Sequence, residues 1–361
     1  MRLSTTDSLK NIPSSAWNAL AGDANPFVQH DFLLALETGN CLQPYGWQPH
    51  YLLAHENDEL VGAAPAYIKT NSYGEFVFDW AWAEAYQKNG LAYYPKLVIA
   101  VPYSPVTGPR LLTRNHDHAT KQALVEFAIT QAKQLNLSSV HCLFNMADDH
   151  TAELQSGMMP RFDFQFHWQN HHYENFADFL SRMQSKKRKN ILQERRKVTD
   201  AGIEIKIYRG DELTDELWQV VYDFYRITFD KKFGHATLSL DFFQAIASKL
   251  LVPLAFHHGK PVAGAICLLG KDTLYGRHWG CYADYNSLHF ELCYYTGIEY
   301  CITHQLQFFE PGAQGEHKIA RGFLPTKTLS SHWIAHSGFS HAIADFLQRE
   351  AHAMNHYGEE L

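Results

Sequence analysis

The chain has 361 residues, of which 46% are hydrophobic and 14% aromatic, so it is long enough for two domains and can fill a sizeable core in each. Its formal net charge of −7 excludes a surface that is basic throughout, and an anionic partner would have to meet a local basic patch. The six cysteines form no CxxC pair and the 22 histidines no HExxH motif, so no metal site is predicted.

The start of the chain lacks an apolar run of signal-peptide length. No later stretch approaches the roughly 18 continuous apolar residues of a membrane-spanning helix. We therefore expect a cytoplasmic protein without stable insertion in a membrane, whose cysteines stay reduced.

The first half of the chain alternates extended and helical patterns. "NPFVQHDFLLALE" (25–37) predicts a helix start, with Asn25 as cap and Pro26 in the first turn. Residues 50–69 predict a strand, a turn and a second strand. An extended region at 92–112, a helix at 117–136 and a strand at 138–145 follow.

The second half predicts a similar mixture. Helices are expected at 176–200, 214–230, 239–250, 288–305 and 338–356, and strands at 203–208, 251–257, 262–269, 273–281, 306–310 and 328–335.

A weak internal repeat links the two halves. In "LVGAAPAYI" (60–68) and in "PVAGAICLL" (261–269), a valine after a polar turn is followed by small and then bulky residues. Close packing of hairpin strands would explain the likeness as well as duplication does. Both copies precede further strands and a helix, which favours two copies of one α/β unit. We predict domains at 1–166 and 167–361, the second containing a basic helix at 176–200.

That basic helix carries the densest cluster of positive charge in the chain. Between residues 186 and 197 it carries seven lysine and arginine side chains against the single carboxylate of Glu194. On a helix they form an outer face opposite an apolar one. A solvated charged face is the ordinary explanation, but an acidic chain makes so dense a patch unusual, and we favour binding to phosphates of a coenzyme, a nucleotide-linked substrate or tRNA. The predicted anion-binding residues are Lys186, Lys187, Arg188, Asn190 and Arg195.

Two further stretches could carry chemistry. In "EPGAQGEHKIARGF" (310–323), Glu316, His317 and Arg321 could alternate along a strand edge. A histidine general base at His317 could then act on an amine while Arg321 holds an anionic group, although a polar turn would look the same. The loop is not a GxxxxGK[ST] phosphate loop. Glu291 follows an aromatic strand and lies in the first turn of a predicted helix, where the helix dipole alone would favour a carboxylate.

Several long segments in order resemble the FemAB-like family of predicted bacterial N-acyltransferases, known as peptidoglycan biosynthesis or recognition proteins. The segments include "YGEFVFDWAWAEAY", "YYPKLVIAVPYSPVTGPRLL", "LHFELCYYTGIEYCI" and "FEPGAQGEHKIARGFLPT". The resemblance implies an α/β protein with two tandem GNAT-like acyltransferase folds, each a mixed central sheet flanked by helices. "KKRKNILQERRKVTDAGIEI" also resembles the basic helix that leads into the second unit of Fem-type proteins, and "HKIARGF" lies where they carry an "FKxGF" segment.

The working hypothesis is transfer of an acyl or aminoacyl group from an activated donor, acyl-CoA or aminoacyl-tRNA, to an amine, with a cell-wall precursor as one candidate acceptor. No tightly bound cofactor is expected. Glu291 and His317 are the candidate bases. Arg321 or backbone N–H groups would hold the oxyanion, and Tyr275 or Tyr294 would return a proton to the leaving group. Predicted substrate-binding residues are Asp79, Trp80, Trp82, Arg277, His278 and Lys318. The alternative is a non-catalytic module that binds a cell-wall precursor, nucleotide or tRNA.

Overall fold

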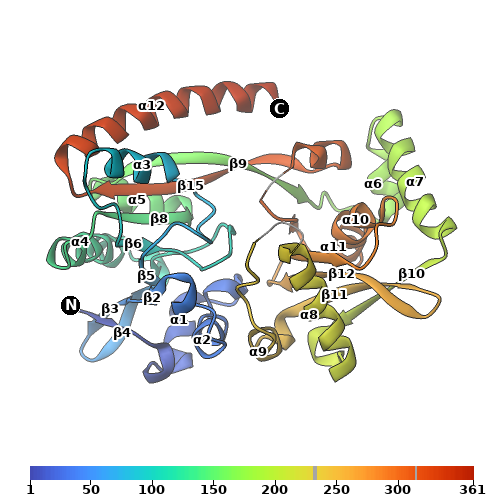
Figure 1. The fold of residues 1–361 in the computed structure, drawn as a ribbon, viewed down its shortest axis with the longest axis horizontal. Coiled ribbons are helices and arrows are strands. Elements are labelled where there is room, and N and C mark those ends of the chain that lie inside the picture. Colours follow the sequence, from blue (N-terminus) through green and yellow to red (C-terminus); the bar gives the residue numbers. More distant parts are fainter. Residues whose placement is uncertain (231–233, 314) are drawn as a thin grey trace. The chain divides into compact units, whose positions relative to one another are not determined.

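The computed structural model describes residues 1–230, 234–313 and 315–361 (Figure 1). The chain forms two compact units. Unit 1 comprises residues 1–164 and 327–361, and unit 2 comprises residues 165–326. Each unit is an α/β structure with its own mixed sheet.

Unit 1 contains two sheets. The smaller sheet has the strand order β1-β3-β4-β7. In the larger sheet the neighbouring strands of this unit are β15-β8-β6-β5-β2. Pro65 separates β4 from β5, so one hairpin contributes to both sheets, as expected where proline removes a ladder donor. The strands β6 and β8 run parallel. The pairs β1–β3, β3–β4, β4–β7, β2–β5, β5–β6 and β8–β15 run antiparallel. The strands are β1 (Arg2–Thr6), β2 (Trp47–Pro49), β3 (Tyr51–Glu56), β4 (Glu59–Ala64), β5 (Ala66–Lys69), β6 (Lys96–Ile99), β7 (Leu112–Thr113), β8 (Ser139–Asn145) and β15 (Leu324–Ile334).

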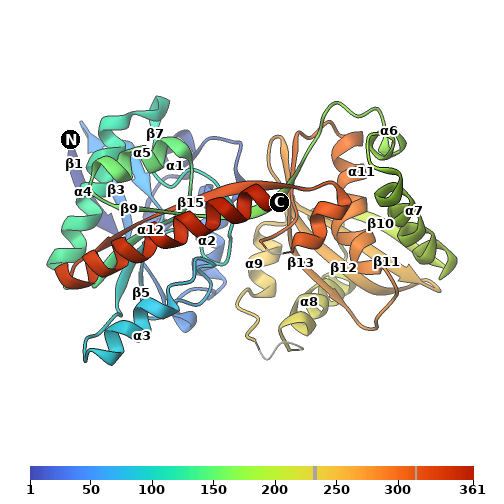
Figure 2. The ribbon, with the colours of Figure 1, turned by 90° about the horizontal axis from the view of Figure 1, so that it is seen from above.

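Helices cover both faces of the larger sheet in unit 1. Val140 and Cys142 of β8 share a buried cluster with α4, whereas His141 between them contacts Trp82 of α3 on the opposite face. On that second face α12 packs against α3 through a separate apolar cluster, and Figure 2 shows α12 along its whole length. The helices are α1 (Ser14–Ala21), α2 (His30–Thr38), α3 (Trp80–Lys88), α4 (His118–Gln134), α5 (Ala147–Gln155) and α12 (Ser337–Glu360).

The sheet of unit 2 has the order β10-β11-β12-β13-β14-β9. Here too the pairs are antiparallel except one, β13 with β14. The end of β9 completes the sheet, with Trp168 opposite Phe309. The strands are β9 (Met159–Gln169), β10 (Ile203–Arg209), β11 (Leu250–His257), β12 (Lys260–Leu269), β13 (Thr273–Cys281) and β14 (Phe308–Glu310).

Helices again cover both faces in unit 2. On one face α8 approaches β13 so closely that a Cβ on Gly280 would lie 1.8 Å from the carbonyl oxygen of Phe224, and only glycine fits there. On the other face, Val198 and Leu288 pack over β10–β13. The helices are α6 (Phe176–Ser181), α7 (Ser185–Asp200), α8 (Asp215–Asp230), α9 (Leu240–Ala245), α10 (Leu288–Phe290), the π-helical turn Glu291–Tyr295 and α11 (Thr296–Thr303).

The two units repeat one topology, as the weak sequence repeat predicts. In each, an antiparallel hairpin (β3–β4, β11–β12) precedes a parallel strand pair joined by a connection that contains helix (β6–β8, β13–β14). Both hairpins also carry a register shift near the turn, at Ala54/His55 and at Ala255/Phe256. Segment 261–269 lies within β12, the second arm of its hairpin, whereas segment 60–68 covers β4, the second arm of the other hairpin, and continues into β5.

The compact units differ from the expected domains in one respect. The sequence places residues 327–361 in the second domain, but they belong to unit 1. The reason is that β15 pairs with β8, with His332 opposite His141, and that α12 packs on α3. The division at 164/165 lies close to the expected boundary at 166/167.

Three local expectations are also corrected. The helix expected at 176–200 is two helices, because Gln184 adopts an extended conformation before α7 begins. Within 92–112 the longest strand covers only Lys96–Ile99. Residues Glu316–Arg321 form a 3-10 turn, so their side chains do not alternate along a strand edge.

No disulfide joins the six cysteines, five of which are buried. In the described part of the chain, no helix is both long and apolar enough to cross a membrane.

Candidate functional site

The segment after β14 forms a tight turn in unit 2, which we call the His317 turn (residues 315–323). β13 and β14 pair only as far as Tyr275 and Glu310, and the chain leaves the sheet after them. Gly315 (φ 114°) and Gly322 (φ 90°) bracket the 3-10 turn in conformations that L side chains rarely adopt. The backbone of the turn therefore favours glycine at both of its ends.

His317 is exposed on this turn, as is Glu316 beside it. Its Nε2 lies 2.9 Å from the hydroxyl of Tyr294, which is buried on the π-helical turn. Partial burial and the neighbouring cations of Arg321 and Lys318 lower the pKa of His317 below its ordinary value. The imidazole is therefore neutral at pH 7 and able to accept a proton.

Arg321 is buried beside His317. Its Nη1 donates to the carbonyl oxygen of His317 at 2.8 Å, and its Nη2 donates to Oε1 of Glu194 at 2.7 Å. The guanidinium carbon lies 3.5 Å from the ring centre of Phe290, a close cation–π contact. Tyr295 donates to the other oxygen of Glu194.

Lys318 points into the interior of unit 2. Its ammonium donates to the carbonyl oxygen of Gly312 at 2.6 Å. Burial lowers the pKa of this lysine to about 8, with Arg277 acting in the same direction. Lys318 is thus a buried amine whose pKa lies well below the ordinary value of a lysine.

Glu291 and Arg195, predicted as a base and as a donor-binding cation, are partners of each other. Nε of Arg195 donates to both carboxylate oxygens of Glu291 at 3.1 Å, and its Nη2 contacts Glu299 at 2.8 Å. Burial raises the pKa of Glu291, although Arg195 opposes the shift. This bidentate pair occupies the groups that a base and a phosphate ligand would need.

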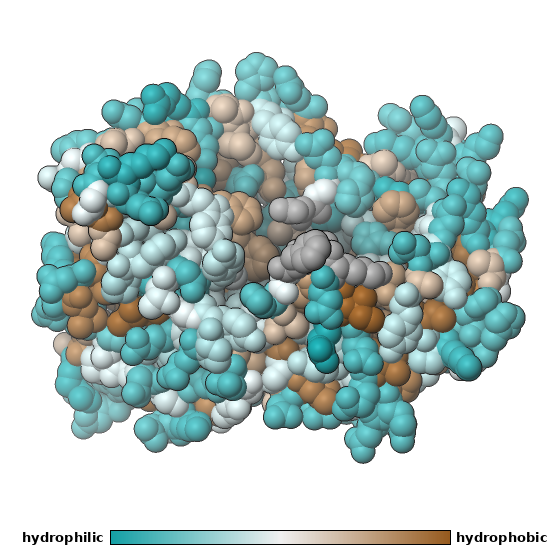
Figure 3. Space-filling view, in the orientation of Figure 1, coloured by the Kyte–Doolittle hydropathy of each residue, from teal (hydrophilic) through white to brown (hydrophobic). Residues whose placement is uncertain are grey.

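The remaining predicted anion-binding residues lie on α7 with different exposures. Lys186 and Asn190 are exposed, whereas Lys187 and Arg188 are half-buried. Lys187 donates to the carbonyl oxygen of Ile319 at 3.4 Å and so touches the His317 turn. In Figure 3 hydrophilic side chains predominate where Figure 1 places α6 and α7.

Three predicted residues lie on β13, whose register shifts beside Arg277. Gly276 pairs with Cys267 and His278 with Ile266, so Arg277 is an extra residue in the strand. Burial lowers the pKa of Arg277 to about 10 and raises that of Tyr275 above its ordinary value. His278 lies among aromatic rings of α8 and α9, and burial lowers its pKa to about 3.

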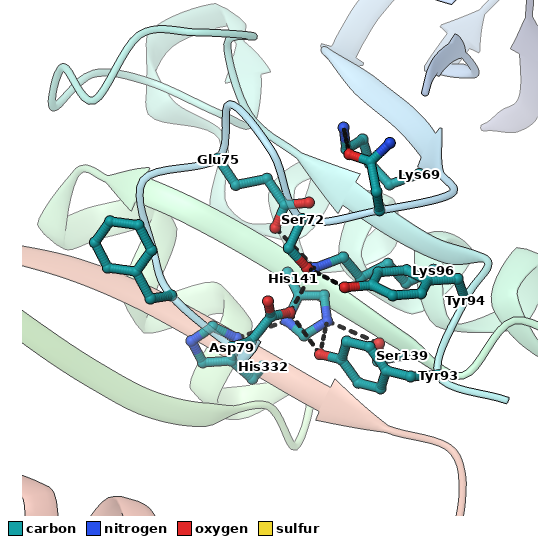
Figure 4. A network of polar contacts seen from close by, with 12 residues as sticks. Lys69, Ser72, Glu75, Asp79, Tyr93, Tyr94, Lys96, Ser139, His141 and His332 are labelled. Carbon is teal, nitrogen blue, oxygen red and sulfur yellow. Dashed lines mark hydrogen bonds and ion pairs between the residues drawn. The ribbon is translucent and has the colours of Figure 1, made fainter. Parts of the chain in front are cut away.

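A second polar cluster lies inside unit 1 and contains Asp79 (Figure 4). The ammonium of Lys96 is the centre of this unit 1 cluster and donates to Asp79 at 2.5 Å, to Glu75 at 2.8 Å and to Ser72 at 2.9 Å. Tyr93 donates to the same Asp79 oxygen at 2.6 Å. Within the described residues, Oδ1 of Asp79 and Oε1 of Glu75 have no hydrogen-bond partner.

The cluster continues through two neutral histidines. Nε2 of His141 lies 2.7 Å from the hydroxyl of Ser139 and 3.3 Å from that of Tyr93. Nδ1 of His141 lies 2.7 Å from Nδ1 of His332, which is fully buried in β15. Burial lowers the pKa of His141 to about 3. Since Tyr93 donates to Asp79, one consistent proton arrangement has His332 donating to His141 and His141 donating to Tyr93 or Ser139.

Burial and the central lysine control ionisation in this cluster. Burial raises the pKa of Glu75 to about 7 although Lys96 opposes it. For Asp79 burial acts in the same direction, but the attraction of Lys96 prevails and lowers the pKa to about 2. On the adjacent strand, burial lowers the pKa of Lys69 to about 7.

Of the other residues predicted around Asp79, Trp82 is buried against His141, and Trp80 is 42% exposed. Trp80 touches the ring of Tyr73 on the preceding loop. The loop thus buries its carboxylates while exposing aromatic rings, the reverse of the usual distribution. Sequence reasoning missed Lys96, Glu75, His141 and His332, because none has a local pattern that names its partners.

No group of three or more histidine, cysteine, aspartate or glutamate side chains in the described ranges could hold a metal ion.

The repeated sheet topology, with one parallel strand pair in each otherwise antiparallel sheet, agrees with the predicted fold class, two GNAT-like units in tandem. The FemAB-like family, described as peptidoglycan biosynthesis or recognition, matches residues 8–361, and the chain belongs to that family. The resemblance given by the sequence segments is thereby confirmed.

Solved structures agree with this fold. FemX aligns with 10% identity over 95% of this chain and 100% of its own, with a TM-score of 0.58. A conserved protein of unknown function from Bacteroides thetaiotaomicron aligns with 10% identity over 91% and 99%, TM-score 0.53. L-PGS from Bacillus licheniformis aligns with 10% identity over 91% and 98%, TM-score 0.51. At such identities the likeness concerns the fold alone. No curated protein matches the chain.

Proposed function

We propose that this protein is an N-acyltransferase, which moves an acyl or aminoacyl group from an activated donor to an amine, and that the reaction takes place at the His317 turn. The observation that carries the proposal is the neutral, exposed imidazole of His317, 2.9 Å from Tyr294 and beside the buried guanidinium of Arg321. Family membership supports an acceptor that is a cell-wall precursor.

An amine is protonated at neutral pH and must lose a proton before it can attack a carbonyl carbon. In the tautomer with its proton on Nε2, His317 donates to Tyr294 and keeps the lone pair of Nδ1 for this proton. Glu291 is a weaker candidate, because both of its oxygens accept from Arg195. The geometry thus favours His317 over Glu291 as the base.

In the transfer step a C–N bond forms between the acceptor and the acyl carbon. The bond from that carbon to the donor then breaks, a C–S bond for acyl-CoA or a C–O bond for aminoacyl-tRNA. The positive charge of Arg321 would stabilise the intermediate oxyanion. The leaving sulfur or oxygen takes up a proton, for which Tyr294 is our candidate donor.

The test uses purified protein, an amine-bearing cell-wall precursor and either acyl-CoA or aminoacyl-tRNA, with the acylated product measured by mass spectrometry. His317→Ala should lower the rate by about a hundredfold or more. His304→Ala is the matched control, since His304 is exposed and bonds only within its own helix turn. Equal rates in the two variants would exclude His317 as the base. Thermal stabilisation by the precursor, without any product from the wild type, would identify a binding module instead.

A further inference from the structure

The His317 turn is held in unit 2 by side chains of α7 that the proposed reaction does not use. Lys187 and Glu194 are seven residues apart, two helical turns, and so lie on one face of α7. Lys187 donates to the carbonyl oxygen of Ile319, and Glu194 accepts from Arg321 at 2.7 Å. Two side chains of the same helix therefore contact the 3-10 turn Glu316–Arg321 within the His317 turn.

Arg321 links the side chain of Glu194 to the backbone of His317. One guanidinium nitrogen is bound to Glu194, and another donates to the carbonyl oxygen of His317 at 2.8 Å. The second oxygen of Glu194 accepts from Tyr295, which fixes the rotamer of the carboxylate. Among the described residues, Glu194 binds Arg321 and Tyr295 and has no hydrogen bond to the imidazole of His317, so any effect on the imidazole is exerted through Arg321.

The guanidinium also has a buried Nε–H that is not used. Nε of Arg321 is buried and has no hydrogen-bond partner among the described residues. Buried donors in folded proteins are nearly always paired, and an exception calls for an explanation such as a catalytic role or a bound water. A guanidinium held by a carboxylate, with its Nε–H unpaired, is suited to an anionic oxygen of a ligand.

We propose that Glu194 is a positioning residue: it fixes Arg321, which in turn fixes the His317 turn and keeps its Nε–H for an anionic oxygen of the substrate. That oxygen could belong to the tetrahedral intermediate or to a carboxylate or phosphate of the substrate. The role of the oxygen rests on the proposed function, whereas the fixing of the turn does not.

The first test needs no substrate. Hydrogen exchange of the backbone amides of residues 317–323 is compared in wild type, Glu194→Gln and Glu299→Gln. Glu299 is the matched control, because it also forms an ion pair with α7, at 2.8 Å from Arg195, but has no hydrogen bond or ion pair with the described residues of the turn. Exchange of the turn should accelerate at least about threefold in Glu194→Gln and stay at the wild-type rate in Glu299→Gln. Unchanged exchange in Glu194→Gln would overturn the positioning role.

The second test measures kcat and KM with the donor and acceptor that give product. Glu194→Gln should lose between about ten- and a hundredfold in kcat/KM, and Glu194→Asp should recover part of it, because misplacement by about 1 Å is that costly. A loss in kcat identifies the oxyanion as the ligand of Arg321, and a rise in KM identifies a carboxylate or phosphate of the substrate. Loss equal to that of Glu299→Gln would refute the proposal.

The two tests separate failure of the proposal from failure of the proposed function. Accelerated exchange without any product from the wild type leaves Glu194 as the residue that fixes the turn and excludes acyl transfer with these substrates. If Glu194→Gln does not fold, Arg321→Lys carries the same comparison, because lysine keeps the charge but loses the fork that reaches both Glu194 and His317.

Discussion

The unit 1 cluster and the His317 turn use the same kinds of side chain in opposite ways. In unit 1, Lys96 is completely buried between two carboxylates and its hydrogen bonds continue through Tyr93 to two neutral histidines. In unit 2, the imidazole of His317 is exposed while the cations that lower its pKa are buried beside it. The first arrangement is buried away from solvent, with Oδ1 of Asp79 and Oε1 of Glu75 unpaired among the described residues. The second presents a neutral base to solvent, which is why we assign chemistry to unit 2 and a mainly structural role to Lys96.

Among the substitutions that test this comparison, one at Lys96 should have the largest effect on stability. Lys96→Met removes the cation between Glu75 and Asp79 and should lower the free energy of unfolding by about 3–5 kcal/mol, the usual cost of leaving buried charges without their partner. Urea denaturation measures the change. Lys88→Met removes an exposed pair with Glu84 and should cost less than about 1 kcal/mol. A small effect at Lys96 would mean that the cluster opens to water.

The pH dependence of stability gives a smaller effect in the same unit. Because the pKa of Glu75 is raised from 4.5 to about 7 in the folded state, the folded protein keeps a proton that the unfolded chain releases. Stability from this group is present below pH 4.5 and is lost as the pH rises to about 7. The free energy of unfolding should therefore fall by between about 1 and 3 kcal/mol from pH 4.5 to pH 7, as measured by urea denaturation at each pH. Glu75→Gln should remove this fall. Glu84→Gln, on the exposed side of α3, should keep it.

The smallest of these effects concerns the contact between Tyr294 and His317. Tyr294→Phe removes one hydrogen bond and should lower the rate of transfer by about tenfold, with a loss of stability of about 1 kcal/mol. Tyr285→Phe is the control, because Tyr285 contacts His257 at 3.3 Å in the same unit. A rate loss shared by both variants would show that the contact of Tyr294 with His317 has no special part in the reaction.

Local patterns in the sequence predicted most of the elements. The apolar spacing of α4, α8 and α12 and the strand runs of β8, β11, β12 and β13 were recognisable, since each depends on neighbours within a few turns or residues. The break between α6 and α7 was not, because no proline or glycine marks it. The π-helical turn at Glu291–Tyr295, which places Tyr294 beside His317, also has no local signal.

Some residues of the candidate site could likewise be predicted from the sequence, and others could not. His317, Arg321 and the glycines around them could be selected from one short segment, and their importance for catalysis stays a prediction. Glu194 could not be selected, because its partner Arg321 is 127 residues away. The same holds for the pairing of Glu291 with Arg195, which turned two separately predicted functional residues into one ion pair.

The sequence by itself determined the family, the tandem α/β fold and the basic helix, because those follow from ordered segments, periodicity and composition. Only the tertiary structure decided that β15 and α12 belong to unit 1, and that Lys96, Asp79, His141 and His332 form one network. The physical reason is that strand pairing and buried ion pairs join residues far apart in the chain. The preference of a side chain for a partner is general, and the fold alone selects which partner is within reach.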